Sequence, residues 1–297
     1  MKMKNKMFKI NNNEELLLLC QATGKTKEWL LAHPEYKNFW ALLKYKHYLN
    51  KLKKGTPVAY ILGHKEFFNL DFLVNKHTLI PRPDTEILVD MTINEIYNFL
   101  RLGGPISNSL LIDIGTGTGC IPITILQKLQ DCKMNTSAID ISKGALKIAK
   151  KNAKKYNVDI KFIQGNLLTP VVKSLQFLQS LKSLQFIVIT ANLPYLKEEW
   201  WKKEPSIQKE PKLALVSDNE TGLNIYEQLL IQIVILKSKT LPTGRQVKNQ
   251  KLLILLEIDP RQSTQIFPLI QKYLPSASIE IIKDLSGFDR VVKINLL

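Results

Sequence analysis

Cysteine, histidine and long hydrophobic runs are all scarce in this sequence of 297 residues. The three cysteines, Cys20, Cys120 and Cys132, form no C-x-x-C pair, which argues against a disulfide framework and against a zinc site. The four histidines do not show H-E-x-x-H spacing, so no metal is expected. No apolar stretch reaches the ~20 residues that a membrane helix needs. These absences predict a soluble protein of a reducing cytoplasm, and we expect it to be a monomer.

Acidic residues are also few beside basic ones, 26 against 42, which gives a net charge of +16. Such a charge attracts polyanions. Only five of the basic residues are Arg, however, and Lys lacks the planar fork that suits phosphates and base edges, so a general lysine bias explains the charge about as well. Residues 1–77 carry half of the net charge, so a polyanion or acidic partner would meet this front segment first.

The front segment has the pattern of a small helical domain. Asn11–Asn13, followed by Glu14 and Glu15, offer capping and first-turn side chains ahead of the run Leu16–Leu19. A second apolar stripe with helical spacing runs from Phe39 until Gly55 ends it. We assign residues 1–65 to an N-terminal helical domain.

Two short strands and a proline-rich segment follow this domain. Glu66–Phe68 and Phe72–Val74 flank Asn69–Asp71 as strands flank a turn, which predicts a linking β-hairpin over residues 66–80. Pro81 and Pro83 then hold the chain extended, and Asp84 or Thr85 can cap the next helix. The main domain is therefore assigned to residues 81–297.

Within the main domain, short β-branched runs alternate with helical stretches. The runs are 110–114, 138–139, 161–163, 186–189, 252–258, 279–282 and 290–294. This alternation predicts an α/β fold with a doubly wound, mostly parallel sheet, and the last two runs should pair as an antiparallel hairpin. Two stretches, 171–185 and 237–250, look like surface insertions, because one repeats Ser-Leu-Gln-Phe and the other is polar with Pro and Gly inside it.

A glycine loop follows the first of these strands. Gly115, Thr116, Gly117, Thr118 and Gly119 come directly after the buried run 110–114 and open a helix, so a ligand can approach bare backbone at a helix N-terminus. The glycines fall at every second residue, which differs from the G-x-G-x-x-G spacing of dinucleotide-binding loops. A tight turn without a ligand is the alternative reading.

An acid stands about 20 residues beyond the loop. Asp140 ends the next strand, where a carboxylate can accept hydrogen bonds from both ribose hydroxyls of an adenosine, although it could also serve only as a helix cap ahead of Ser142. The loop and the acid occur together at the correct topological positions. An adenosine-containing cofactor is therefore the leading hypothesis.

The fourth strand delivers the tetrapeptide Asn192-Leu193-Pro194-Tyr195 to the carboxyl end of the sheet. An amide or aromatic amine nitrogen is a poor nucleophile, so catalysis must position it and accept its hydrogens. The Asn192 side chain and a backbone carbonyl offer two acceptors, while Pro194 keeps Leu193 extended and Tyr195 presents a flat face. An ordinary Asn-x-Pro turn is the simpler alternative. The pattern favours methylation of a planar nitrogen with S-adenosylmethionine.

Across most of its length the sequence resembles the peptide chain release factor glutamine methyltransferases. The resemblance is carried by the glycine loop, Asp140, the tetrapeptide and further segments of the chain, namely 55–63, 66–68, 80–86, 210–215, Gly222-Leu223 with Tyr226, Glu257-Ile258 and 283–290. It implies a seven-stranded methyltransferase fold behind a helical domain that docks the release factor. It also implies methyl transfer to the glutamine of the Gly-Gly-Gln loop, with no direct nucleic-acid binding required.

The resemblance assigns roles to matched positions. The glycine loop would hold the methionine end of S-adenosylmethionine, Asp140 the ribose, Asn166 and Leu167 would lie near the adenine, and Asn192–Tyr195 would hold the glutamine amide. Two positions depart from the family pattern: Leu193 stands where Pro is usual, and Asn166 where an acid is common. A backbone carbonyl survives the first change, so activity is expected to persist, while the second could weaken cofactor binding.

Three other functions stay open on sequence grounds. A ribosomal-protein glutamine methyltransferase shares nearly all of these motifs. An adenine amino methyltransferase acting on ribosomal RNA shares the Asn-x-Pro-Tyr element and suits the positive charge, but such enzymes lack the segment 81–86 and the helical domain. A catalytically weak binding protein is the third, motivated by Asn166 and Leu193.

Overall fold

The computed structural model describes Phe8 and residues 12–129, 133–217, 220–240 and 250–296. The chain divides into two units, Met1–Lys65 and Glu66–Leu297. Within the described ranges, no helix is both long enough and apolar enough to cross a membrane.

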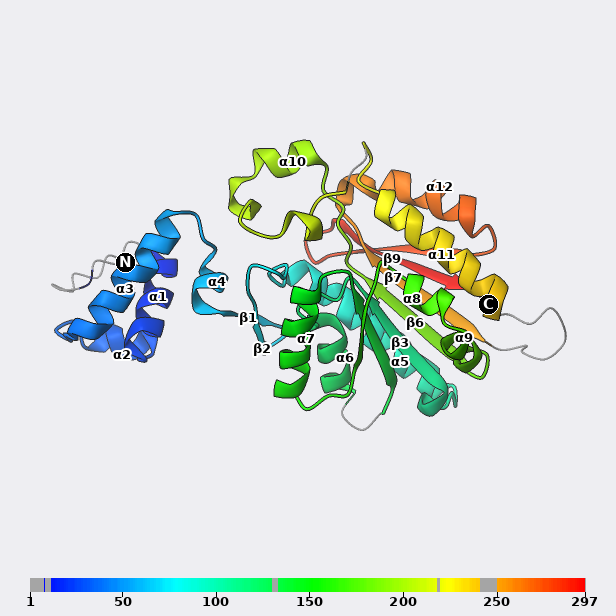
Figure 1. Ribbon diagram of the computed structural model, residues 1–297, viewed down its shortest axis with the longest axis horizontal. Coiled ribbons are helices and arrows are strands. Elements are labelled where there is room, and N and C mark those ends of the chain that lie inside the picture. Colours follow the sequence, from blue (N-terminus) through cyan, green and yellow to red (C-terminus); the bar gives the residue numbers. More distant parts are fainter. Residues whose placement is uncertain (1–7, 9–11, 130–132, 218–219, 241–249, 297) are drawn as a thin grey trace. The chain divides into compact units, whose positions relative to one another are not determined.

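The first unit is helical. Its helices are α1 (Asn13–Thr23), α2 (Lys27–Ala32), α3 (Phe39–Lys53) and α4 (Val58–Leu62) (Figure 1). Asn12, Thr26 and Asn38 each accept a backbone N–H at the start of the first three helices, which satisfies one of the free donors there. Buried Phe8 and Tyr45 contact edge to face in the core of the unit.

Strands β1 (His64–Phe67) and β2 (Leu70–Leu73) form a two-stranded hairpin. Its turn consists of Phe68 and Asn69, whose φ angles are 53° and 59°. Positive φ at both central positions is the geometry of a type I′ two-residue turn, so the turn starts one residue before the predicted Asn69–Asp71 and is one residue shorter. The Phe68 N–H donates to Oε1 of Glu86 at 2.8 Å, which fixes the unusual backbone of this aromatic residue.

The second unit contains a seven-stranded sheet with the order β5-β4-β3-β6-β7-β9-β8. Its strands are β3 (Ser109–Ile114), β4 (Asn135–Asp140), β5 (Lys161–Gln164), β6 (Phe186–Ala191), β7 (Lys251–Glu257), β8 (Ser278–Lys283) and β9 (Asp289–Leu296). Strands β3 to β7 are parallel, and β9 runs antiparallel to both of its neighbours. The predicted doubly wound sheet with a C-terminal antiparallel hairpin is confirmed.

Helices cover both faces of this sheet (Figure 1). One face carries α5 (Glu86–Arg101), α6 (Cys120–Lys128) and α7 (Lys143–Lys155), and the other carries α8 (Thr169–Lys173), α9 (Leu175–Leu181), α11 (Asn224–Thr240) and α12 (Ser263–Tyr273). Side chains of each strand alternate between the two cores: Leu110 and Ile112 face α11, while Leu111 faces α5. Strands buried on both faces must be apolar throughout, which explains their continuous hydrophobic runs.

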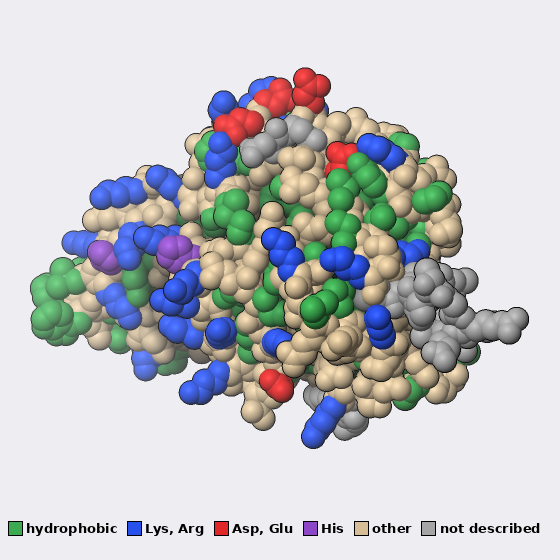
Figure 2. Space-filling model, turned by 45° about the vertical axis from the view of Figure 1, so that its right-hand side comes forward, with side chains coloured by type: hydrophobic (Ala, Val, Ile, Leu, Met, Phe, Trp, Pro, Cys, Tyr) green, Lys and Arg blue, Asp and Glu red, His purple; other side chains and the backbone are tan. Residues whose placement is uncertain are grey.

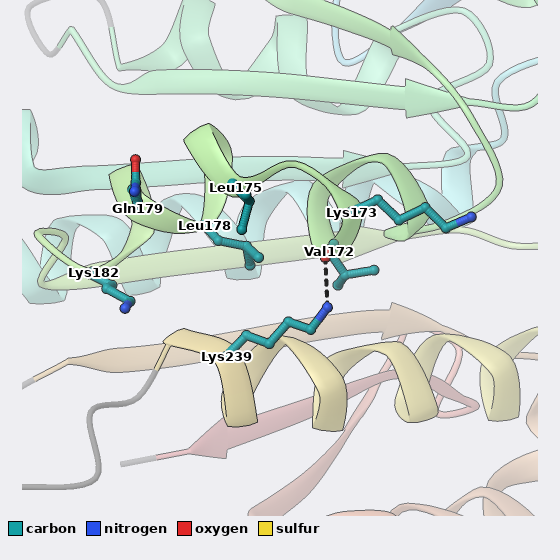
Figure 3. A pocket seen from close by; sticks show the side chains of 7 residues that line it. All are labelled: Val172, Lys173, Leu175, Leu178, Gln179, Lys182 and Lys239. Carbon is teal, nitrogen blue, oxygen red and sulfur yellow. Dashed lines mark hydrogen bonds between the residues drawn. The ribbon is translucent and has the colours of Figure 1, made fainter.

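The stretch 171–185 is not the surface insertion that its sequence predicted. Val171, Val172, Leu178 and Leu181 are all buried in the core beneath the sheet. A hollow of about 740 Å³ lies over this stretch, where Lys239 Nζ donates to the carbonyl of Val172 at 3.1 Å (Figure 3). None of the predicted site residues lines it. In the second predicted insertion, α11 continues to Thr240, and residues 241–249 lie outside the described ranges.

Candidate active site

The register of the parallel strands places the predicted site residues side by side. Ile114 of β3 pairs with Ile139 of β4 and with Ala191 of β6. The residues that follow, Gly115, Asp140 and Asn192, therefore leave the sheet at the same edge. Three segments that are far apart in the sequence meet there, as the pattern predicted.

The glycine loop presents bare backbone at this edge. Gly115, Gly117 and Gly119 have φ angles of 69°, 55° and 79°, which side chains disfavour. A Cβ at Gly115 would stand 3.0 Å from Cδ2 of Leu193, so a larger residue would have to displace this side chain as well as adopt the positive φ. The loop leads directly into α6, whose N-terminal N–H groups point toward the same edge.

Both carboxylate oxygens of Asp140 accept backbone N–H groups, one from the glycine loop and one from the turn that follows β4. Oδ2 accepts the N–H of Gly117 and Oδ1 accepts the N–H of Ser142, each at 2.8 Å. Burial raises the pKa of Asp140, although these two N–H groups lower it in part. Each carboxylate oxygen has a second lone pair, so the group keeps capacity for two further donors such as ribose hydroxyls.

Asp113 and Thr116 are buried beneath the loop and interact with each other through their side chains. The Thr190 hydroxyl donates to Asp113 Oδ1 at 2.7 Å, and burial raises the pKa of Asp113 to about 7. S-adenosylmethionine combines ribose hydroxyls with a cationic methionine end, so the acceptors along this edge suit it.

Asn166 and Leu167 follow β5 at the next position along the edge. The N–H of Gly165 donates to the carbonyl of Asp140 at 3.0 Å, which holds this segment beside β4. Asn166 is exposed, whereas Leu167 is buried with a φ of 50°. The Leu167 side chain packs in the core, so only its backbone can meet a ligand. The positive φ marks local strain at this edge.

The tetrapeptide alternates between the two faces of the sheet. Leu193 is 3% exposed and packs in the core on the α11 side, and its N–H donates to the hydroxyl of Tyr226 at 3.2 Å. Asn192 points to the other side, where its Nδ2 donates to Oγ1 of Thr85 at 3.0 Å. The side chain at position 193 thus serves packing, while the backbone and Asn192 line the site.

Tyr195 is held at both of its polar ends. Its hydroxyl donates to Oε1 of Glu257 at 3.5 Å, and its carbonyl accepts from Nε2 of Gln262 at 3.2 Å. Burial raises the pKa of Tyr195, and nearby Glu257 raises it further. The hydroxyl therefore stays protonated and donates.

A cavity of about 140 Å³ opens beside the tetrapeptide. It is lined by Leu79, Arg82, Asn192, Leu193, Tyr195, Leu196, Ile207, Ala214 and Leu215. This is about half the lower limit for small-molecule pockets, ~300 Å³, and suits a single side chain better than a whole cofactor. Buried Glu210 orders one wall, since it pairs with Arg82 and accepts the N–H of Ile80 at 3.0 Å.

Sequence reasoning did not place Thr85, Tyr226 or Glu257 in the site, although Tyr226 and Glu257 were among the positions that carry the family resemblance; the structure brings all three to Asn192 and Leu193. Ala191 pairs with Leu256, so Glu257 ends β7 beside Asn192. An acid that closes an apolar strand at the carboxyl edge is itself a signal that could have identified Glu257. Thr85 was predicted as a possible helix cap, but its side chain makes no capping hydrogen bond.

This fold and edge define a class I methyltransferase that depends on S-adenosylmethionine. Residues 111–203 match the family model described as a methyltransferase domain, and residues 12–63 match that of the PrmC N-terminal domain. The catalytic domain of hMettl16 in complex with an RNA hairpin has the same fold, with a TM-score of 0.52 and 15% identity over 76% of this chain and 75% of that chain.

Curated relatives identify the family. The release factor glutamine methyltransferase of Bacillus subtilis is 32% identical over 284 residues, covering 95% of this chain and 90% of that protein. That of Enterococcus faecalis is 35% identical over 246 residues, covering 82% and 77%. The chain belongs to the release factor glutamine methyltransferase family.

Proposed function

We propose that this protein transfers a methyl group from S-adenosylmethionine to the side-chain amide nitrogen of the glutamine in the Gly-Gly-Gln loop of peptide chain release factors. One observation carries the proposal: a cavity of about 140 Å³, sized for a side chain, is bordered by the Asn192 amide at the edge that also holds the glycine loop. The family relationship supports the same substrate.

The tetrapeptide residues position the target nitrogen. An amide nitrogen is a weak nucleophile because its lone pair is delocalised into the carbonyl group. Asn192 Oδ1 and the carbonyl of Leu193 accept its two hydrogens, which holds the nitrogen in place, and Tyr195 packs against the amide plane. When bound, the cofactor would supply an electrophilic methyl group whose bond to sulfur breaks as the bond to nitrogen forms, and the nitrogen then loses one of its two protons to solvent. Pro194 keeps Leu193 extended throughout.

The cofactor is held along the neighbouring strands. The glycine loop 115–119 binds its methionine end through backbone N–H groups, and Asp140 accepts the ribose hydroxyls. Asn166 and the backbone of Leu167 border the adenine. Asn166 is uncharged, so we expect this contact to be weaker than one made by an acid.

The three segments of the chain have separate roles in this proposal. Residues 1–65 dock the release factor, residues 66–80 form the linking hairpin, and residues 81–297 carry the reaction. Support for docking comes from α3, where Phe39 and Trp40 are 61% and 77% exposed. Figure 2 shows hydrophobic side chains grouped at one end of the helical unit, with lysine side chains around them.

We also propose that the enzyme acts as a monomer and needs no nucleic acid. Labelled S-adenosylmethionine, offered together with purified release factors, ribosomal protein and ribosomal RNA, tests the substrate directly. Label in the release factor glutamine is expected. Label only in ribosomal RNA or only in ribosomal protein would replace the proposal with one of those activities.

Asn192→Ala tests the catalytic assignment. Removal of the acceptor should lower kcat by at least about 10²-fold, the cost of losing one preorganised polar group in an active site, while the Kd for S-adenosylmethionine changes little. Asn135→Ala is the matched control, because Asn135 begins β4 at the opposite end of the sheet. Kinetics with the release factor and calorimetry with the cofactor measure both effects. Unchanged turnover in Asn192→Ala would remove this residue from catalysis.

A further inference from the structure

The orientation of the Asn192 side chain decides whether it can serve a substrate amide. Its end carries one acceptor, Oδ1, and one double donor, Nδ2, which exchange places when the amide turns by 180°. Only Oδ1 facing the cavity accepts hydrogens from an NH₂ group. The opposite orientation sets two donors against each other. The reaction therefore needs something that distinguishes the two ends of Asn192.

Thr85 is the residue that contacts the far end of Asn192. Its Oγ1 lies 3.0 Å from Nδ2, and its side chain is 3% exposed, so water does not compete for the contact. Thr85 stands at the N-cap position of α5, where threonine hydroxyls commonly bind the helix backbone, yet it makes no such bond. The hydroxyl is thereby left to Asn192.

A hydroxyl alone cannot choose between the two orientations, because it donates as readily as it accepts. Glu257 determines which of the two orientations of the Asn192 amide is stable. Its carboxyl is 1% exposed. Burial raises the pKa of this carboxyl, and hydrogen bonding with the Thr85 hydroxyl lowers it in part. Oε2 makes no other hydrogen bond of ordinary geometry within the described ranges, so it is available as an acceptor. When the ionised Glu257 carboxylate accepts the hydrogen bond of the Thr85 hydroxyl, Thr85 offers Asn192 only lone pairs, and Nδ2 must turn toward it.

The same strand end also fixes the second acceptor. The Tyr226 hydroxyl donates to the backbone carbonyl of Glu257 and accepts the N–H of Leu193 at 3.2 Å. One residue of β7 thus anchors both the side chain of Asn192, through Thr85, and the backbone of Leu193, through Tyr226.

We propose that Thr85 is a positioning residue, held by Glu257, which fixes the Asn192 amide with Oδ1 toward the substrate. The inference rests on the proposed function, since it concerns how that reaction is aligned. It assigns to Thr85 and Glu257 an effect on turnover rather than on cofactor binding.

Thr85→Val tests the inference, because valine keeps the shape and removes the hydroxyl. We expect kcat for the release factor to fall about 10²-fold, as for a misplaced catalytic group, with KM and the cofactor Kd within about twofold of wild type. Thr85→Ser should restore most of the activity. Thr85→Ala repeats the comparison without the added methyl group, should valine disturb folding.

Thr92→Val is the matched control. Thr92 is a buried threonine of the same helix, and its hydroxyl binds only the carbonyl of Leu88, at 2.7 Å, within the described residues. Its kcat should match wild type. The inference is overturned if Thr85→Val and Thr85→Ala keep full kcat, if Thr85→Ser is as slow as Thr85→Val, or if Thr92→Val is equally impaired.

Failure of the inference can be told from failure of the proposed function. If the wild-type protein methylates the release factor and Asn192→Ala does not, while both Thr85 variants are fully active, only the positioning role is wrong. If the wild-type protein labels no release factor at all, the proposed function itself is wrong.

Discussion

Glu257 is an acid that folding places out of reach of water. Burial raises the pKa of its carboxyl to about 7, although the hydroxyl of Thr85 and the positive charge of Arg290 lower it in part. The titratable or charged groups that interact with it come from five separate segments of the chain. They are Asp84, Cys120, Tyr195, Tyr226 and Arg290. Keeping an ionised carboxylate in this place costs stability.

Glu257→Gln should therefore change how stability depends on pH. In the wild type, the folded pKa of about 7 lies above the ordinary value of 4.5, so the contribution of this group is fully present below pH 4.5 and is lost as pH rises through 7. The difference corresponds to about 3 kcal/mol. Urea unfolding of both proteins should show the variant gaining about this much relative to wild type between pH 4 and pH 8.

The comparison with wild type removes the pH dependence of other groups such as Asp113, which both proteins share. A stability difference that does not change with pH would contradict the raised pKa of Glu257. A gain in stability together with a loss of turnover in Glu257→Gln would show that Glu257 serves the alignment of the Asn192 amide at a cost in stability.

For single residues, the sequence predicted the place of a residue in the fold better than its hydrogen-bond partners. The position of Asp140 and Asn192 at one edge could be predicted because Asp140 ends a strand, Asn192 directly follows another, and the ends of parallel strands meet at one edge. Thr85 was read as a possible cap because local spacing is all that a sequence shows, whereas its hydrogen bond reaches 107 residues along the chain. Contacts of that range depend on how the helices pack.

Helix α7 connects the hairpin to the glycine loop through one buried side chain. Asn152 accepts the N–H of Leu73 at 2.8 Å and donates to the carbonyls of Leu73 and Thr118, at 3.1 and 2.9 Å. All of its polar atoms are used, and it is fully buried. The loop that we propose as the cofactor-binding loop is thereby fixed to strand β2.

Asn152→Leu should loosen this connection. Three backbone groups lose their partner at ~1–3 kcal/mol each where no water replaces it, so we expect a loss of about 3 kcal/mol in unfolding free energy and weaker binding of S-adenosylmethionine. Lys155→Ala is the control, since Lys155 also joins α7 to the hairpin. It does so by an exposed ion pair with Asp71 that contributes ~1 kcal/mol or less. Urea unfolding and calorimetry report both quantities. Equal effects of the two changes would contradict a special role for Asn152.

Elements were more predictable than their turns. The central strands β3, β6 and β7 were found because burial on both faces demands apolar residues throughout, and all seven strands occur where the runs predicted them. The turn at Phe68 was placed one residue late, because an aromatic residue at positive φ is unusual and depends on the contact with Glu86. The stretch 171–185 was misjudged because its repeat hid a helical spacing of buried residues.

For the whole molecule, the exposed apolar side chains of the first unit bear on how a protein substrate is recognised. Phe39, Trp40 and Leu43 lie on α3 and are 61%, 77% and 44% exposed. Large exposed aromatic groups often mark protein interfaces, where tryptophan contributes strongly.

Trp40→Ala should raise KM for an intact release factor by about tenfold, corresponding to ~1.4 kcal/mol, without changing kcat. A short peptide that contains Gly-Gly-Gln should show the same kcat/KM with wild type and variant. Leu285→Ala is the control, because Leu285 is fully exposed in the second unit. Steady-state kinetics with both substrates make the test, and an unchanged KM for the intact factor would exclude Trp40 from docking.

The position of β9 has a consequence for the way the chain acquires its structure. This last strand lies between β7 and β8, so β8 has no neighbour in the sheet until residues 289–296 are available. Arg290, which pairs with Asp84 and Asp284, arrives with it. The sheet therefore closes only after β9 has been synthesised, and a variant without β9 would leave β7 as an open sheet edge and β8 without a neighbour.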